Sequence, residues 1–212
     1  MRHVIWDWNG TLFDDLHITV EAVNASLAQL DAPPIGADDY RDHYTRPVHI
    51  FYDRLLGRKI SSEEWLQIDQ TYHEVYRRGL PRADLTLDTR DALESVQKRG
   101  WTQSILSMWW HDELVPFVAD RDLTRFMERV DGNTGDPGET KRIHLERHLS
   151  ELGIEDRTAD EFLVVGDSLD DAVAAAHAGV PAVLDDGGAH HLSELEAAGV
   201  PVVSSLQAAL DA

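Results

Sequence analysis

Two acidic segments, far apart in the sequence, each follow a short apolar stretch. Asp7-Trp8-Asn9-Gly10-Thr11 follows residues 3–6, and Gly166-Asp167-Ser168-Leu169-Asp170-Asp171 follows residues 162–165. Carboxylates held close together raise each other's pKa unless a positive charge lies between them. A hard divalent cation with oxygen ligands, usually Mg²⁺, supplies that charge. An aspartate in such a site can also act as a nucleophile toward phosphorus. The two segments therefore predict metal-assisted phosphoryl chemistry.

Two further residues complete this chemistry. Ser107 ends a β-prone stretch, and Lys141 begins a predicted helix. Phosphoryl transfer depends mainly on positioning and charge neutralisation, which a cation, a lysine, a hydroxyl and backbone donors supply together. Taken alone, Ser107 also fits the polar end of a strand, and Lys141 fits an ordinary surface lysine.

The elements that would position these residues alternate between strands and helices. Strands are predicted at 3–6, 102–106, 126–130, 162–165, 182–184 and 200–203, with helices at 88–99, 111–118, 140–152, 171–178 and 191–198. Such alternation predicts an α/β fold: a Rossmann-like three-layer core with a parallel sheet covered by helices on both faces. Ligands of these sheets bind beyond the carboxyl ends of the strands, so the acidic segments should meet in one crevice.

A block of helices separates the first strand from the rest. Helices are predicted at 16–30, 38–44, 47–56 and 61–78, from apolar spacings of three and four residues and from N-capping serines. We expect an inserted α-helical cap at residues 16–84, with a core formed by residues 1–15 and 85–212. Arg46, between two cap helices, is the candidate contact for a substrate anion, although a surface arginine explains it equally well.

Composition limits the classes of partner. The chain has 212 residues, no cysteine, and 39 Asp and Glu against 19 Lys and Arg, which gives a formal net charge of −20. This charge opposes a broad grip on nucleic acid or anionic lipid, whereas a bound cation would still permit a small phosphorylated ligand. No signal-like or membrane-spanning apolar stretch is present, so we expect a cytoplasmic protein. Oligomeric state is not predicted.

The same residues resemble a known family. The sequence is similar to haloacid dehalogenase superfamily phosphohydrolases with an inserted helical cap, and among them to phosphoglycolate phosphatase-like members. The family's Asp-x-Asp-Gly-Thr-Leu is matched by residues 7–12 with one departure, at Asn9. Ser107 and Lys141 match the second and third motifs, and residues 166–179 match the Gly-Asp-Ser-x-x-Asp motif that opens an Ala-rich helix.

The resemblance implies a Mg²⁺-dependent hydrolase of a small phosphorylated metabolite. Asp7 is the implied nucleophile and would form an aspartyl-phosphate. The implied metal ligands are Asp7, the main-chain carbonyl of Asn9 and Asp167, with Asp171 as a further ligand or as a carboxylate that supports the ligands. The implied contacts to the phosphoryl oxygens are Gly10, Thr11, Ser107, Met108 and Lys141. Asn9, Ser107 and Lys141 join Asp7 as the implied catalytic set.

Asn9 stands where the family has a second aspartate, which protonates the leaving alcohol and later activates water. An amide does not titrate near neutrality, and general acid–base help is worth about 10² to 10⁴ in rate. Its loss is serious for an alkyl phosphate and slight for an acyl or aryl phosphate. Four explanations stay open: a slow or selective phosphatase, a phosphotransferase or holder of a long-lived phospho-aspartate, a catalytically silent phosphometabolite-binding or interaction protein, and an engineered change. Asp14, Asp15 and His43 are candidate proton sources.

Two histidines offer a competing metal site. His144 and His148 lie four residues apart on a predicted helix, as metal-binding histidines can, but no third ligand accompanies them. A solvated helix face is therefore expected here. Asp170 is likewise expected to be a solvated charge in the first turn of its helix.

Overall fold

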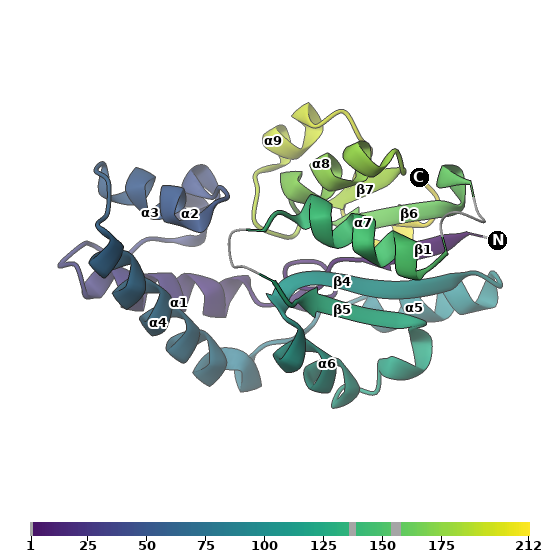
Figure 1. Cartoon of the computed structure of the whole chain (residues 1–212), viewed down its shortest axis with the longest axis horizontal. Coiled ribbons are helices and arrows are strands. Elements are labelled where there is room, and N and C mark those ends of the chain that lie inside the picture. Colours follow the sequence, from purple (N-terminus) through teal and green to yellow (C-terminus); the bar gives the residue numbers. More distant parts are fainter. Residues whose placement is uncertain (1, 136–138, 154–157) are drawn as a thin grey trace.

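The core of the molecule is a six-stranded parallel sheet with helices on both faces (Figure 1). The computed structural model describes residues 2–135, 139–153 and 158–212. The strand order is β5-β4-β1-β6-β7-β8, which places β1 at the centre, between β4 and β6. The strands are β1 His3–Trp6, β4 Thr102–Trp110, β5 Arg129–Asn133, β6 Phe162–Gly166, β7 Ala182–Asp185 and β8 Val202–Val203.

Alternating side chains of β1 explain why both faces of the sheet are covered. Val4 and Trp6 belong to the apolar cluster under α5, α6 and α10, whereas Ile5 belongs to the cluster under α7 and α8. All three side chains are at most 1% exposed, as expected for a central parallel strand. The α/β expectation is confirmed. The helices are α5 Thr89–Lys98, α6 His111–Ala119 and α10 Leu206–Ala209 on one face, and α7 Lys141–Glu151, α8 Leu169–Ala178 and α9 Leu192–Ala197 on the other.

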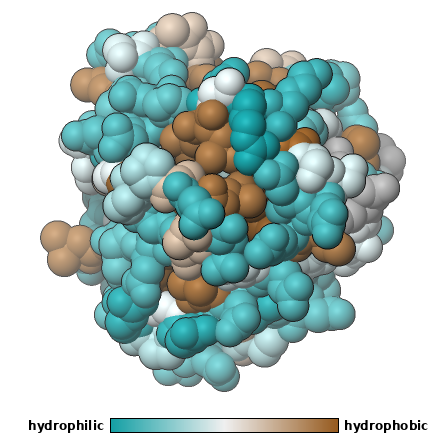
Figure 2. Space-filling view, turned by 90° about the vertical axis from the view of Figure 1, so that its left-hand side faces the viewer, coloured by the Kyte–Doolittle hydropathy of each residue, from teal (hydrophilic) through white to brown (hydrophobic). Residues whose placement is uncertain are grey.

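A helical insert lies to one side of the core (Figure 1). Its helices α1 and α4 pack along each other, and Val23, Leu27, Phe51 and Ile68 are buried in a small apolar core of its own. Figure 2 views this end of the molecule and shows hydrophobic residues gathered at the middle of a largely hydrophilic face. The helices are α1 Leu16–Ala28, α2 Ala37–His43, α3 Val48–Leu56 and α4 Ser62–Gly79, followed by a 3₁₀ turn at Leu80–Arg82. Among the described residues, no helix has the length and apolar character needed to cross a membrane.

A two-stranded antiparallel sheet joins the two ends of the insert and was not expected from the sequence. β2 (Phe13–Asp14) pairs with β3 (Asp84–Leu85), and the Thr86 hydroxyl donates to the carbonyl of Thr11 at 2.6 Å. Strands of two residues are too short to show the alternation that predicts a strand. The pairing brings the residues that follow β1 next to the chain that returns from the insert.

Two core strands differ from their predicted bounds by three residues or more. β4 continues to Trp110, so Ser107 lies inside the strand and not after it, next to a register irregularity between Leu106 and Trp110. β5 begins at Arg129 because residues 124–126 form a 3₁₀ turn. Both strands therefore end later than predicted. Trp110 and Asn133 are paired at the carboxyl edge of the sheet, where the candidate site lies.

Candidate active site

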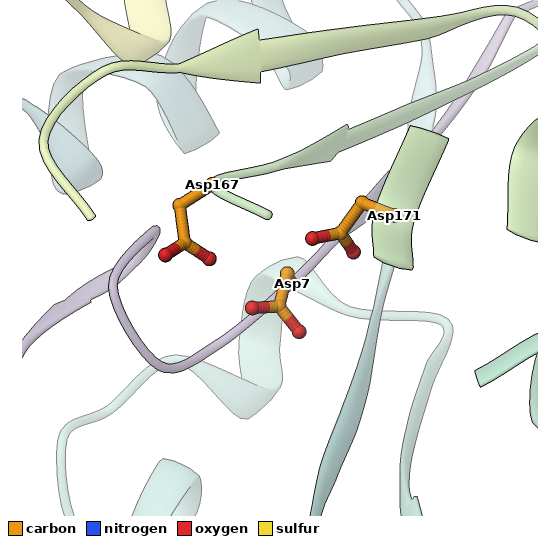
Figure 3. A group of neighbouring side chains, drawn as sticks. All are labelled: Asp7, Asp167 and Asp171. Atoms are coloured by element: carbon orange, nitrogen blue, oxygen red, sulfur yellow. The ribbon is translucent and has the colours of Figure 1, made fainter. Parts of the chain in front are cut away.

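Asp7, Asp167 and Asp171 meet at the carboxyl edge of the sheet. Figure 3 shows their three carboxylates pointing toward one another, and one oxygen from each lies within 4.8 Å of one from each of the others. Asp7 directly follows β1, where its N–H donates to the Val165 carbonyl at 2.8 Å. Asp167 follows β6, and Asp171 lies in the first turn of α8. All three are at most 8% exposed.

The Asp167 carboxylate lies in a tight backbone cradle. Ala189 N–H donates to its Oδ2 at 2.8 Å, and the Thr11 hydroxyl donates to its Oδ1 at 3.5 Å. A Cβ atom at Gly10 or at Gly188 would collide with this carboxylate. Gly10 also has a φ of +75°, which favours glycine. The Gly-Thr that follows Asn9 therefore permits a close approach of two loops.

Lys141 supplies a positive charge to this cluster. Its ammonium group, 7% exposed at the start of α7, forms ion pairs with Asp7 and, at 2.5 Å, with Asp171. The second oxygen of Asp171 accepts from the N–H and hydroxyl of Ser168, at 3.1 and 2.6 Å. Lys141 was predicted from its position alone, and the structure brings it to the acidic residues.

The electrostatics leave the site short of positive charge. Burial raises the pKa of Asp7 to about 6, against the lowering effect of Lys141, and the charge of Asp171 adds to the rise. Burial also raises the pKa of Asp167 well above its usual value, and the charges of Asp7 and Asp171 raise it further. One lysine cannot balance three buried carboxylates, so the donor set fits a divalent cation with oxygen ligands.

Asn9 lies between two sets of partners. Its Nδ2 donates to Asp15 Oδ2 and to the Tyr76 hydroxyl oxygen, both at 2.8 Å, and its Oδ1 accepts from the Ser107 hydroxyl at 3.3 Å. Ser107 also accepts from Trp109 N–H at 3.0 Å. Burial raises the pKa of Asp15, and hydrogen bonds from Tyr76 and Asn9 oppose that rise. Sequence reasoning missed Tyr76, which comes from α4.

The three candidate proton sources, Asp14, Asp15 and His43, have different surroundings in the structure. Asp15 is 4% exposed and contacts Asn9 directly. Asp14 is exposed in β2, and His43 bonds through Nδ1 to the Asp39 carbonyl within α2. Of the three, only Asp15 forms a hydrogen bond with Asn9 among the described contacts.

Three predicted contacts to the phosphoryl oxygens remain: Gly10, Thr11 and Met108. Gly10 N–H donates to Asp15 Oδ1 at 3.0 Å, so this amide is already used within the loop. Thr11 is fully buried beside Asp167, and Met108 is half-buried next to Ser107 in β4. Gly10 therefore contributes close approach of the backbone, not a free donor.

The insert contacts the core around the site. Arg46 Nε lies 3.2 Å from Asp170 Oδ2, in a pair whose side chains are 39% and 40% exposed. Asp170 is thus ion-paired and not simply solvated. Arg41 Nε donates to the Gly188 carbonyl at 3.0 Å, next to the Asp167 cradle. An open cleft of about 500 Å³ lies between α4 and the carboxyl ends of β4 and β5. It is lined by Arg77, residues 110–113, Asn133 and Thr134.

The expectation of a solvated face for His144 and His148 was wrong. Both side chains are fully buried, because this face of α7 packs on the sheet. His148 contacts Asp131 Oδ2 through Nδ1 and Ser104 Oγ through Nε2, both at 2.7 Å. Ser, His and Asp form a nucleophilic triad in some hydrolases, but this serine is 0% exposed and no substrate reaches it. These contacts hold α7 on the sheet.

Comparison with known proteins agrees with this arrangement. A family model described as haloacid dehalogenase-like hydrolase matches residues 1–179. The chain is 23% identical over 190 residues to a phosphoglycolate phosphatase of Aliivibrio fischeri, covering 84% of this chain and 81% of the relative. It is 26% identical over 210 residues to one of Salmonella paratyphi A, covering 86% and 80%.

Solved structures share the fold. A haloacid dehalogenase-like family protein from Streptococcus pneumoniae superimposes with a TM-score of 0.84 at 16% identity, over 100% of this chain and 97% of that one. A predicted phosphoglycolate phosphatase from Haemophilus somnus gives 0.78 at 15%, with the same coverage. Identities this low support the fold alone, but the family model spans most of the sequence, and the chain therefore belongs to the haloacid dehalogenase-like hydrolases.

Proposed function

We propose that the protein is a Mg²⁺-dependent phosphomonoesterase that acts on a small phosphorylated metabolite through an aspartyl-phosphate. The observation that carries this proposal is the buried cluster of Asp7, Asp167 and Asp171 with Lys141 as its counter-charge. The relatives named phosphoglycolate phosphatase support the same reaction class. A substrate with a phosphoryl group would bring further negative charge into the site, which the cation and Lys141 would offset.

In this proposal Asp7 is the nucleophile. A carboxylate oxygen of Asp7 attacks phosphorus, the bond from phosphorus to the leaving oxygen breaks, and water later hydrolyses the aspartyl-phosphate. Bound Mg²⁺ would neutralise charge on the phosphoryl oxygens. Its proposed ligands are Asp7, the Asn9 carbonyl, Asp167 and Asp171. The proposed contacts to the phosphoryl group are Thr11, Ser107, Met108 and Lys141, and Gly10 would permit the close approach of the backbone.

The insert would act as a cap over this site. We assign residues 16–84 to the cap and residues 1–15 and 85–212 to the core. Closure would exclude water from the reacting groups. Arg46, half-exposed at the rim, would exchange its contact with Asp170 for an anionic group on the substrate, because guanidinium groups bind carboxylates and phosphates well.

Turnover of p-nitrophenyl phosphate tests the proposal, because an aryl phosphate needs little acid assistance. We expect release of p-nitrophenol with Mg²⁺, loss of activity with EDTA, and loss in Asp7→Asn. Asp14→Asn is the matched control, since Asp14 is an exposed carboxylate of the same segment. A wild-type protein that binds p-nitrophenyl phosphate in the presence of Mg²⁺ but does not hydrolyse it would instead support the catalytically silent binding protein.

A further inference from the structure

The side-chain nitrogen of Asn9 has two acceptors. An amide nitrogen carries two hydrogens. Nδ2 lies 2.8 Å from Asp15 Oδ2 and 2.8 Å from the Tyr76 hydroxyl oxygen. Tyr76 in turn donates its own hydrogen to Asp15 Oδ2 at 2.7 Å, which closes a triangle of three hydrogen bonds. Only Oδ1 of Asn9 then faces Ser107.

Asp15 is surrounded by donors. In addition to Asn9 and Tyr76, Gly10 N–H donates to its Oδ1 at 3.0 Å and the Thr19 hydroxyl donates to its Oδ2 at 3.4 Å. Tyr76 is held independently, by stacking on Tyr72 and by edge contact with Trp109. Both partners of Asn9 are therefore fixed by contacts that do not involve Asn9.

We propose that Asp15 and Tyr76 are positioning residues that make an amide necessary at position 9 and fix its Oδ1 toward Ser107. A carboxylate at position 9 has no hydrogen for Asp15 or for the Tyr76 oxygen, and would bring two carboxylates into contact. The arrangement also directs Nδ2 toward Asp15 and Tyr76 and Oδ1 toward Ser107, so Asn9 presents an acceptor on its Ser107 side.

This assignment has a positional half, which concerns the contacts of Asn9, and a substrate half, which concerns the leaving group. The substrate half rests on the proposed function and deepens it. Without a titratable acid at position 9, the substrates favoured are those whose leaving oxygen departs with its electron pair as a stable anion. Acyl phosphates, which release a carboxylate, and aryl phosphates, which release a phenolate, meet that requirement. The aspartyl-phosphate then releases its phosphoryl group to water, and the Asp7 carboxylate is regenerated while the proton of water passes to the phosphate product. The inferred substrate class is therefore an acyl or aryl phosphate.

A double-mutant cycle on stability tests the positional half without any need for turnover. The variants are Asn9→Asp, Asp15→Asn and the double exchange, compared by thermal unfolding at pH 8. We expect Asn9→Asp to lower the unfolding midpoint by about 5 °C. In the double exchange the amide introduced at position 15 donates to the carboxylate introduced at position 9. The unfolding midpoint should therefore be higher than the value expected from adding the two single changes. The matched control combines Asn9→Asp with Asp14→Asn, and the two changes in unfolding midpoint should be additive there. Additive effects in the Asp15 cycle would overturn the assignment.

Leaving-group dependence tests the substrate half. We expect kcat/KM of the wild type to be at least about 100-fold higher for p-nitrophenyl phosphate than for glycerol 2-phosphate. The double exchange should shrink this ratio at least about 10-fold, and Asn9→Asp alone should shrink it less. If position 9 had only a structural role, the exchanges would change kcat/KM for both substrates by the same factor. Equal ratios in the two variants would overturn the inference. A coupled stability cycle in a protein that hydrolyses neither substrate would support the positional half while overturning both the substrate class and the proposed function.

Discussion

Asp7 and Lys141, 134 positions apart in the sequence, form a buried ion pair at the carboxyl edge of the sheet. Burial disfavours the charged form of Lys141, but the carboxylates of Asp171 and Asp7 raise its pKa overall. The lysine is thus held charged by the residues that it neutralises. Fixed charge of this kind acts on a phosphoryl group without reorganisation at the moment of reaction.

Replacement of Lys141 tests this balance of charge. Lys141→Met leaves two buried carboxylates without their partner, which we expect to cost about 3 to 5 kcal/mol of unfolding free energy. Turnover of p-nitrophenyl phosphate should fall by about 10² or more. Urea unfolding and steady-state kinetics measure the two effects. Lys98→Met is the control, because Lys98 is exposed and pairs only with Glu94 among the described contacts. Equal loss in both variants would contradict a special role for Lys141.

Mg²⁺ should stabilise the fold through the three carboxylates. A ligand present at about 100 times its Kd adds about 2.7 kcal/mol, which should appear as a raised thermal unfolding midpoint at pH 8. Asp167→Asn should remove most of this rise, whereas Asp170→Asn, which alters the neighbouring rim residue, should retain it. Because the pKa of metal-free Asp7 is about 6, protons should compete with Mg²⁺ below that pH and weaken the effect. An unchanged midpoint in the wild type would contradict the metal site.

Asp185 is not a proposed metal ligand, and its burial predicts that the free energy of unfolding depends on pH. Burial raises its pKa from 3.8 to about 6, with smaller contributions from the charges of Asp186 and Asp88. The folded state therefore holds this proton more tightly than the unfolded chain, and the contribution of Asp185 to stability falls as pH rises from about 4 to 6. Asp185→Asn should remove that fall and stabilise the protein at pH 7 by up to about 3 kcal/mol. Its Oδ1 can still accept from Gly187 N–H.

Chemical denaturation of Asp185→Asn and wild type at pH 4.5 and pH 7 measures this difference. The exposed Asp14→Asn again serves as the control and should keep the wild-type difference in stability between the two pH values. If the variant is no more stable than the wild type at pH 7, the buried carboxylate is not the source of the pH dependence.

Arg46 should affect binding more than stability. Its ion pair with Asp170 is about 40% exposed on each side, and such pairs contribute about 0 to 1 kcal/mol. For a substrate with a second anionic group, Arg46→Ala should raise KM about 10-fold, which corresponds to about 1.4 kcal/mol. 4-Carboxyphenyl phosphate provides that group and p-nitrophenyl phosphate does not. Arg54→Ala, at an exposed arginine of the same insert, is the control. An equal rise in KM for both substrates would argue against an anion contact.

Ser104 should matter for stability and not for turnover. Ser104→Ala removes hydrogen bonds to His148 and His3, at 2.7 and 2.8 Å, from a fully buried position. Loss of buried partners costs about 1 to 3 kcal/mol. We expect an unfolding midpoint several degrees lower with kcat/KM unchanged, whereas the exposed Ser150→Ala should change neither. A loss of activity larger than the loss of folded protein would instead point to a direct role of Ser104 in turnover.

The sequence predicted those parts of the site that follow strands. Asp7 and Asp167 came from apolar stretches that end in acids, and the rule for ligand sites in parallel sheets placed them together. Ser107 was assigned to a strand end because it is the polar residue that follows Ile105-Leu106, but the pairing of β4 with β5 carries the strand on to Trp110. Lys141 was predicted from its position at the start of a helix, and family spacing supported it, but nothing in its own neighbourhood marks it as buried.

The contacts of Asn9 could not be predicted in this way. Tyr76 lies 67 positions away on a helix of the insert, and an aromatic residue on such a helix normally indicates packing. Its approach to Asn9 depends on how α4 returns to the core through β3, a strand of two residues. His144 and His148 were misjudged for a related reason: their spacing identifies one face of a helix, and only the sheet beneath determines that this face is buried.

The loop after β7 has two neighbours, one on each side. Gly188 accepts from Arg41 of the insert through its carbonyl, and the adjacent Ala189 donates its N–H to Asp167. In the proposed enzyme, closure of the insert and binding of a cation at the acidic cluster would therefore act on the same peptide unit. Thermodynamic linkage makes such an influence reciprocal. If a bound cation favoured a closed insert in the proposed enzyme, closure of the insert would tighten cation binding by the same free energy.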